Sequence, residues 1–348
     1  MTMKGGVIDG RNAAGTVVRQ SWMLIDADDV TIDGTEMRYV DDAPLTRDGG
    51  LRVADGRNRP TIKNCNLHHA TYAPLAIGSA NNALVQNCDI HDGGALGIHA
   101  GGGVGGVGNR LIGNRIYNNN TAEQYSAEWE SGGVKATVQT NLVMDGNEVY
   151  GNHGPGLWCD IYCRNTHYTN NRIHDNTHAG VMEEVSYDGV ITGNVTWRNG
   201  FGKNVWGWGT GILVSSSTGT VVSGNTSAWN ARSCISVISQ DRHDWPAVKP
   251  YKNISVRDNT CAALDNTMGI GWLEDWSGPL FSSTSANSGA TNRYWFPTVE
   301  DGRWRFAWNG YVSYLSAFNA TAADEGAVYL TTTQKNSLMS AAGVPTSP

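Results

Sequence analysis

The sequence predicts an all-β fold, a parallel β-helix in which a solenoid of coils repeats every 23 residues or so. Three observations point to it: a short motif centred on Asn or Cys recurs along the chain, glycine is abundant at 43 residues, and β-branched runs are short. The high density of glycine and asparagine leaves no apolar stripe with a 3.6-residue period in the sequence. This excludes a helical repeat.

The recurrent motif places one Asn or Cys at the same point of each coil. These anchor residues are Cys65, Cys88, Asn114, Asn147, Asn171, Asn194, Asn225 and Asn259. Stacked coils bring equivalent residues to about 4.8 Å, so the anchor amides should hydrogen-bond along the solenoid axis. We interpret Cys65 and Cys88 as small members of this ladder rather than as a disulfide. The six cysteines are too dilute for a disulfide scaffold and do not indicate a redox compartment.

Three intervals between anchors are long, and their extra residues should leave the coil as loops. The loops fall at 117–132, 200–209 and 240–251. Loops on a rigid scaffold commonly carry binding and catalytic residues. The repeat fades after residue 275, so we divide the chain into a β-helix domain, 1–275, and a C-terminal loop and cap segment, 276–348, that packs on it. Trp295, Trp304 and Trp308 are expected to cover the end of the core.

After each anchor the chain should run into a second strand, which can be aligned on its glycine or equivalent small residue. Side chains alternate along a strand, so one column should point into the core. That inward column is Ile77, Ile98, Val134, Leu157, Val181, Ile212 and Ile235. The next column points outward and reads Gly78, His99, Lys135, Trp158, Met182, Leu213 and Ser236.

Two residues further along, Asp160 and Glu184 are predicted to point outward from successive coils, with Lys135 diagonally one coil before Asp160. Like charges stacked this way repel and should raise one of the two pKa values, which creates an acid and a base. The alternative is a solvated sheet face on which Lys135 neutralises both carboxylates. Glu183 should point inward and be hydrogen-bonded, and a one-residue slip would exchange Glu183 and Glu184.

The loops supply flat aromatic rings of the kind that bind sugar rings. Trp129 and Glu130 belong to the first loop, and Trp206 and Trp208 to the second. Aromatic faces cover the apolar side of a sugar while carboxylates and amides take its hydroxyls. Trp158 is the best placed of them, next to Asp160. His153 and His178 precede the site strands as secondary candidates.

Another column resembles a functional stripe but is interpreted as packing. It comprises the residues three positions after an anchor, namely His68, His91, Tyr117, Tyr150, His174 and Trp197. Stacked rings are a common way to fill the corners of a solenoid. We therefore expect these rings to stack on one another rather than to bind substrate.

Composition and charge exclude several partners. Charged residues make up only 16% of the chain and the net charge is −7, without a Lys/Arg run, so no nucleic-acid partner is expected. Apolar runs fall far short of the ~18 residues that a membrane span needs, so no membrane partner is expected. The first ten residues lack the pattern of a signal peptide.

Four stretches resemble right-handed parallel β-helix proteins of the pectate-lyase-like superfamily, particularly bacterial and phage-borne ones, over residues 5–265. The stretches are WESGGVK (129–135), HGPGLWCDIYCRNTHYTNN (153–171), EEVSYDGVITGN (183–194) and WGWGTGI (206–212). The resemblance implies a polysaccharide-degrading protein, either extracellular or virion-associated. Phage depolymerases of this kind are often trimers, so the resemblance allows a homo-oligomer such as a trimer but does not establish the oligomeric state.

The family pattern carries over onto individual residues of this chain. Its WE-x-GG-[IV]-K falls on Trp129, Glu130 and Lys135, and its GLW-x-D falls on Trp158 and Asp160. Its E-[IV]-SYD falls on Glu184, Val185 and Asp188. Relatives often carry His where this chain has Glu183, which puts a role for that residue in doubt.

The resemblance leaves three functions open. The first is a glycoside hydrolase with Asp160 and Glu184 as its catalytic carboxylates, assisted by Glu130 or Asp188, and with no cofactor. The second is a lyase or epimerase on a uronic-acid polymer, with Lys135 as the base and a calcium ion neutralising the sugar carboxylate. The third is a non-catalytic glycan-binding tail or adhesin. The sequence offers few cations around the site besides Lys135, which favours the hydrolase.

Overall fold

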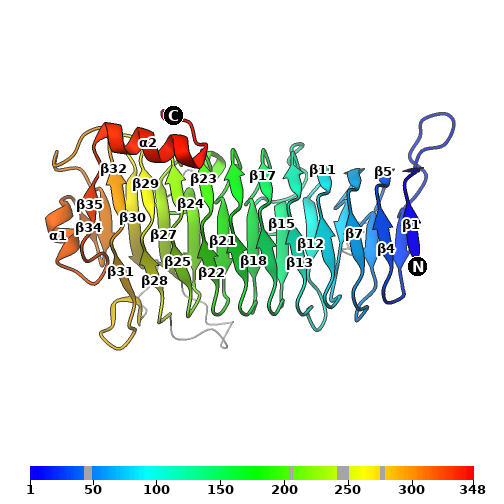
Figure 1. The fold of residues 1–348 in the computed structure, drawn as a ribbon, viewed down its shortest axis with the longest axis horizontal. Helices are drawn as coiled ribbons and strands as arrows, with labels where there is room; N and C mark the ends of the chain where they lie inside the picture. Colours follow the sequence, from blue (N-terminus) through cyan, green and yellow to red (C-terminus); the bar gives the residue numbers. More distant parts are fainter. Residues whose placement is uncertain (43–48, 204, 206, 241–250, 275–278) are drawn as a thin grey trace. The chain divides into compact units, whose positions relative to one another are not determined.

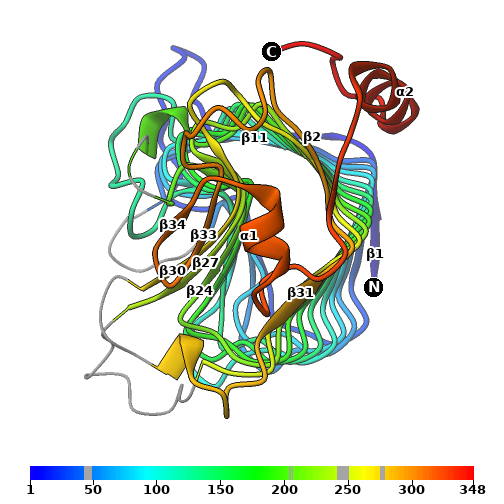
Figure 2. The ribbon, with the colours of Figure 1, turned by 90° about the vertical axis from the view of Figure 1, so that its left-hand side faces the viewer.

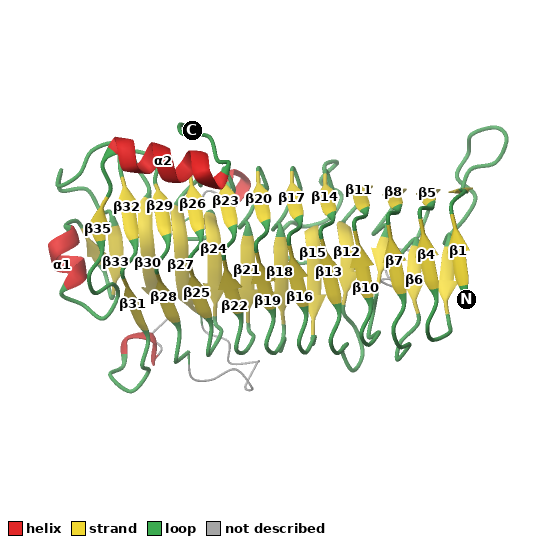
Figure 3. Cartoon of the chain, viewed as in Figure 1, coloured by secondary structure: helices red, strands yellow, loops and turns green. Residues whose placement is uncertain are grey.

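The computed structural model describes residues 1–42, 49–203, 205, 207–240, 251–274 and 279–348. The chain divides into two compact units, residues 1–167 and 168–348, and each is treated by itself. Each unit is a stack of coils in which successive coils pair strand on strand in parallel, as the strand arrows of Figures 1 and 3 show. The predicted parallel β-helix is confirmed.

Each coil of the first unit contributes one short strand to each of three sheets. The first sheet contains β1 (Thr2–Lys4), β4 (Thr31–Asp33), β7 (Thr61–Lys63), β10 (Leu84–Gln86), β13 (Arg110–Ile112) and β16 (Val143–Asp145). The second contains β2 (Val7–Asp9), β5 (Glu36–Val40), β8 (Asn66–Ala70), β11 (Asp89–Gly93), β14 (Arg115–Tyr117) and β17 (Glu148–Tyr150). The third contains β3 (Met23–Ile25), β6 (Leu51–Val53), β9 (Leu75–Ala76), β12 (Leu96–Ala100), β15 (Gly132–Thr137) and β18 (Leu157–Asp160).

The second unit repeats this plan after β19 (His167–Thr169), which spans the boundary. Its first sheet contains β22 (Val190–Thr192), β25 (Val221–Ser223), β28 (Ser255–Arg257) and β31 (Ser288–Ala290). Its second contains β20 (Arg172–His174), β23 (Val195–Trp197), β26 (Thr226–Ala228), β29 (Thr260–Ala262), β32 (Arg293–Trp295) and β35 (Val328–Tyr329). Its third contains β21 (Val181–Glu184), β24 (Thr210–Ser215), β27 (Ser233–Ser239), β30 (Met268–Glu274), β33 (Phe306–Trp308) and β34 (Tyr311–Val312).

Columns of apolar side chains from the three sheets fill the inside of the coils. In the first unit the third sheet contributes Ile98, Val134 and Leu157, which pair in register and are fully buried. In the second unit Val181, Ile212 and Ile235 do the same. The predicted inward column is therefore confirmed in these coils. Burying each such side chain contributes about 1.5–3 kcal/mol, which makes the columns the main support of the fold.

The first member of the predicted columns is wrong. Ile98 pairs with Leu75 and His99 with Ala76, so Ile77 and Gly78 stand two positions too far along the chain. Strand β9 is only two residues long, and Gly78 lies in the turn after it with a left-handed φ of +49°. The predicted register sets Ala76 level with Gly97 as its equivalent small residue, whereas Ala76 pairs with His99, because a two-residue strand has too few alternating positions to define the register.

The anchor residues form the expected ladder inside each unit. The Asn114 backbone N–H and Nδ2 both donate to Asn147 Oδ1, at 2.9 and 3.0 Å. In the second unit Asn171, Asn194, Asn225 and Asn259 repeat these bonds. Cys65 and Cys88 occupy the same slot as free thiols, as expected, and the Cys65 N–H donates to Cys88 Sγ at 3.4 Å.

A second asparagine ladder lies five residues after the first. It joins Asn119 to Asn152 in the first unit and Asn176 to Asn199 and Asn230 in the second. The ring column also stacks as packing: successive ring centroids in His68, His91, Tyr117 and Tyr150 lie 4.7, 4.6 and 5.0 Å apart. The interpretation of that column as packing agrees with this geometry.

Parallel pairing continues past residue 275, because β31, β32 and β33 pair with β28, β29 and β30. Helix α1 (Leu315–Asn319) then lies across the open end of the coils, where Leu315 and Phe318 are buried (Figure 2).

Helix α2 (Thr332–Ala342) lies outside the second sheet, with Met339 packed in a cluster with Trp197 and Trp229. Trp304 is 63% exposed, so the expectation that it covers the core is wrong.

The C-terminal end of the asparagine ladder gives a prediction about pH. Asn292 Nδ2 donates to Asp324 Oδ1 at 3.0 Å, and Tyr294 OH donates to the other oxygen. Burial raises the pKa of Asp324 from 3.8 to about 6. The folded state then holds a proton that the unfolded chain releases, so stability falls by about 2 kcal/mol as pH rises from 4 to 6. Asp324→Asn should remove this decrease, measured as the wild-type-minus-variant difference in unfolding free energy at pH 4 and 7. A difference independent of pH would contradict the assignment.

Candidate active site

The outward column on the third sheet of the first unit has the predicted register. His99 pairs with Lys135, and Lys135 pairs with Trp158. Two residues further on, Thr137 pairs with Asp160. Strand alternation therefore directs Lys135, Trp158 and Asp160 to the face opposite the buried Val134 and Leu157.

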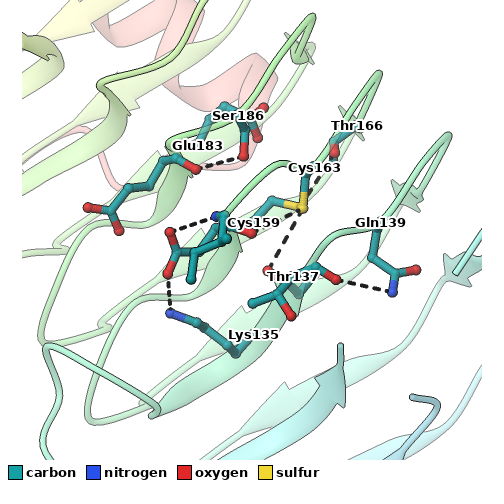
Figure 4. Close-up of a disulfide and its surroundings, with 12 residues drawn as sticks. Lys135, Thr137, Gln139, Cys159, Cys163, Thr166, Glu183 and Ser186 are labelled. Atoms are coloured by element: carbon teal, nitrogen blue, oxygen red, sulfur yellow. Dashed lines mark hydrogen bonds and ion pairs between the residues drawn. A yellow bond between two sulfur atoms is a disulfide. The ribbon is translucent and has the colours of Figure 1, made fainter. Parts of the chain in front are cut away.

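Lys135 and Asp160 form a buried ion pair. Lys135 is 2% exposed and Asp160 is 9% exposed, and Lys135 Nζ lies 2.7 Å from Asp160 Oδ2 (Figure 4). The same ammonium donates to the carbonyl of Trp129 at 3.0 Å and sits 3.0 Å from the centre of the Trp158 ring. The site thus holds a carboxylate and its counter-ion in a place from which most water is excluded, where charges interact strongly.

The second oxygen of Asp160 is also held. Its Oδ1 accepts a hydrogen bond from the backbone N–H of Ile161 at 2.8 Å. Asp160 is the last residue of β18, and the chain turns immediately after it. One oxygen is therefore oriented by the neighbouring coil through Lys135 and the other by the turn, which fixes the plane of the carboxylate.

The first loop closes over this column. Trp129 is 69% exposed, and Tyr72 OH donates to Glu130 Oε2 at 3.1 Å. The buried ring of Tyr72 meets His99 and Tyr125 edge to face, at 6.2 and 5.8 Å. The loop therefore presents one aromatic face to solvent and brings one carboxylate beside the column.

Two residues that hold this arrangement carry no sequence signal we recognised. The backbone N–H groups of Tyr72 and Ala73 donate to Asp42, at 2.8 and 3.0 Å, while burial raises the pKa of Asp42 to about 6. Asn120 Nδ2 donates to the carbonyls of Tyr125 and His153. Asn120 follows the ladder residue Asn119, so the second ladder, once recognised, would have located it.

Trp158 contributes an indole N–H to the site. The residue is 3% exposed, and its Nε1 has no hydrogen-bond acceptor among the described residues. A buried N–H without a partner costs about 1–3 kcal/mol, so such groups commonly face a ligand or a water molecule. Trp158 thus offers a donor next to the Asp160 carboxylate.

Glu184 and Glu183 belong to the second unit. Glu184 ends β21 and is 6% exposed, while the neighbouring Glu183 is fully buried and accepts from Tyr168 OH at 2.7 Å. The inward, hydrogen-bonded placement expected for Glu183 is therefore confirmed. The pairing of Asp160 with Glu184 relates the two units and stays a prediction from the sequence.

The remaining candidates each have their own local surroundings. His153 Nδ1 lies 3.5 Å from Glu123 Oε1, and His178 Nδ1 lies 3.2 Å from Thr177 Oγ1. Asp188 is exposed in the turn before β22, and Trp208 is half-buried in the turn before β24. Trp206 lies outside the described residues. Within the described ranges, no group of three or more His, Cys, Asp or Glu side chains has a geometry that could hold a metal ion.

Two disulfides occur, Cys159–Cys163 beside Asp160 and Cys234–Cys261 in the second unit. The sequence did not indicate them, since cysteine count and spacing gave no framework. No helix among the described residues has the length and apolar character to cross a membrane.

Comparisons with known proteins place the fold. A family profile described as "Right handed beta helix region" matches residues 49–227. The structure of XylC with xylose aligns with a TM-score of 0.59 at 15% identity, covering 84% of this chain and 54% of that one. The A-module of the mannuronan C-5 epimerase AlgE4 from Azotobacter vinelandii aligns at 0.58 and 15%, covering 95% and 89%.

The Dettilon tailspike protein aligns with a TM-score of 0.52 at 16% identity, covering 94% of this chain and 59% of the tailspike chain. The chain thus spans just over half the length of the XylC and tailspike chains. A comparison with curated protein sequences finds no match. At these identities the structural likeness establishes the shared β-helix fold.

Proposed function

The chain belongs to the right-handed β-helix family, and from this premise we propose that it is an enzyme that cleaves a polysaccharide. The observation that carries the proposal is the buried Lys135–Asp160 ion pair, which contacts the ring of Trp158 and the backbone carbonyl of the exposed Trp129. A charged carboxylate next to an aromatic face suits a sugar ring, which needs both an apolar platform and acceptors for its hydroxyls. The structural neighbours described as bound to xylose or as a mannuronan epimerase are consistent with a carbohydrate substrate.

Within this proposal the reaction is glycoside hydrolysis, with Asp160 as the ionised carboxylate. The Lys135 ammonium stabilises its negative charge, and the Ile161 N–H holds its other oxygen, so the group is suited to act as nucleophile or general base. Hydrolysis also needs a carboxylic acid. The sequence predicts Glu184 as the second catalytic carboxyl group, and Glu130 is the candidate within the first unit. A carboxyl separation near 5 Å would give retention, and about 6.5–9.5 Å would give inversion.

The second candidate is a lyase or C5 epimerase acting on a uronic-acid polymer. It is favoured by the alignment to the alginate epimerase module, which covers 89% of that module. Lys135 would then be the base, with calcium as the proposed metal. The geometry weighs against it, because the Lys135 ammonium has to release a proton before it can act as a base, whereas the ion pair with Asp160 stabilises its charged form.

Incubation with a panel of neutral and uronic polysaccharides tests both candidates. New reducing ends without absorbance at the unsaturated-uronate band support hydrolysis, whereas reducing ends with that absorbance support a lyase. Inversion at C5 without cleavage, read by proton NMR, supports an epimerase. Glycan binding without any turnover would contradict all enzyme readings and support a non-catalytic adhesin. The two disulfides suit an oxidising location outside the cytoplasm, and we propose an extracellular or virion-associated protein. The resemblance allows a homo-oligomer such as a trimer.

Replacing Trp129 tests the sugar platform. Trp129→Ala should raise KM about tenfold, because it removes an aromatic contact worth about 1.4 kcal/mol, and should leave kcat within a factor of about two. Trp304→Ala is the matched control, since that ring is 63% exposed and stacks on Tyr311 in the second unit. An equal rise in KM for both variants would argue against Trp129 as a specific platform.

A further inference from the structure

The turn after Asp160 is one residue longer than the turn on the preceding coil. Thr137 pairs with Asp160 and, after the turn, Thr140 pairs with Arg164. The two paired positions are therefore three residues apart on one coil and four residues apart on the next. In the second unit Glu184 pairs with Ser215 and Tyr187 pairs with Thr218, so the turns of those two coils are equal in length.

The additional residue adds a second left-handed conformation to the turn. Ile161 has a left-handed φ of +49°, as does the equivalent Val138 at +57°. In the longer turn Tyr162 follows with a second left-handed φ of +65°. Non-glycine residues adopt this region singly and at a cost, so two in succession need support from their surroundings.

The Cys159–Cys163 disulfide supplies that support. It joins the residue before Asp160 to the residue after Tyr162, and both cysteines are fully buried. Cys163 Sγ lies 3.6 Å from the Asp160 carbonyl oxygen and 3.8 Å from that of Ala136 (Figure 4). The turn enclosed by this bridge carries the Ile161 N–H that holds Asp160 Oδ1.

We infer that the Cys159–Cys163 disulfide is a positioning device for Asp160: it holds Ile161 and Tyr162 in consecutive left-handed conformations so that the Ile161 N–H orients the carboxylate toward its substrate. The expected change in kcat rests on the proposed function, whereas the expected change in amide hydrogen exchange at Ile161 does not. Cys159 and Cys163 are positioning residues, since neither sulfur is proposed to touch substrate.

The test compares two disulfides. Cys159→Ala/Cys163→Ala should lower kcat about 10- to 100-fold with little change in KM, because small displacements of a catalytic group have effects of that size. The control is Cys234→Ala/Cys261→Ala, which opens a link between residues 27 apart in the second unit. Longer loops gain more from a disulfide, so the control should lose at least as much thermal stability and yet keep kcat within about twofold.

Amide hydrogen exchange at Ile161 provides a readout independent of activity. Opening of the turn should raise that exchange rate at least about tenfold in the Cys159→Ala/Cys163→Ala variant and leave it unchanged in the control. Adding Tyr162→Gly should restore both kcat and exchange protection, because glycine adopts the left-handed region without strain. If the alanine pair does not fold, the variant with Tyr162→Gly is compared directly with the wild type, where full activity supports the inference and lost activity overturns it.

The outcomes separate the two proposals. Unchanged kcat and unchanged exchange in the alanine pair would overturn the positioning role, as would an equal loss of kcat in the control. If the wild type cleaves no polysaccharide but the exchange results are as expected, the proposed function fails and the positioning of Asp160 stands.

Discussion

Asp160→Asn should lower kcat by about three orders of magnitude while the chain still folds. The substitution keeps the shape of the side chain and its acceptor for the Ile161 N–H, but removes the charge that the proposed hydrolysis uses as nucleophile or base. Reducing-end assays at saturating substrate measure kcat, and far-UV circular dichroism checks folding. A variant that retains more than about a tenth of the wild-type kcat would remove Asp160 from the catalytic machinery.

The matched control for this variant is Asp89→Asn. Asp89 also lies on a strand of the first unit and also pairs with a cation, Arg115, at 2.6 Å, but the pair lies on the second sheet and is well exposed. Asp89→Asn removes one negative charge from the protein, as Asp160→Asn does. Any general effect of net charge on activity would therefore appear in both variants. We expect kcat of the control to stay at the wild-type value.

Lys135→Met should lower the free energy of unfolding by about 3–5 kcal/mol, because it leaves the Asp160 carboxylate nearly buried without its counter-ion. Lys135→Met/Asp160→Leu should recover most of that loss, since a buried ion pair replaced by apolar side chains is often neutral or stabilising. Urea denaturation of the three proteins measures both effects. The double variant should remain inactive, which separates the stability of the site from its chemistry.

An exposed ion pair provides the contrast. Arg115→Met breaks the pair with Asp89, in which the side chains are 53% and 35% exposed, and should cost less than about 1 kcal/mol. If Lys135→Met costs no more than Arg115→Met, then water reaches the Asp160 carboxylate and the site is not the low-dielectric environment that the burial of Lys135 indicates.

The sequence predicted the fold class and most of the register because both depend on repetition. Alternation along a strand and glycine at the coil corner are local rules, and they correctly aligned His99, Lys135 and Trp158. The same rule failed at Ala76, which stands for the strand glycine in the predicted alignment but pairs with His99. The two-residue strand Leu75–Ala76 has too few alternating positions to define the register.

Features that could not be predicted from the sequence depend on contacts that no periodic pattern encodes. The Tyr72 hydroxyl reaches Glu130 across 58 positions of sequence, and the spacing of four between Cys159 and Cys163 is not itself a disulfide signal. The second asparagine ladder was accessible, because Asn119, Asn152, Asn176, Asn199 and Asn230 each follow an anchor by five residues. This ladder therefore repeats with the same period as the anchors and is encoded in the sequence as plainly as they are.

Helix α2 has a consequence for the order of events during folding. Hydrogen bonds of the asparagine ladder join residues 23 to 34 positions apart, so each coil needs only its neighbouring coil in order to form them. Arg172, by contrast, donates to the carbonyl of Ala342 across 170 positions. Contacts with such large sequence separation form slowly, because the intervening chain must first be ordered. We therefore expect α2 to dock as a late folding step, after the strands that it covers.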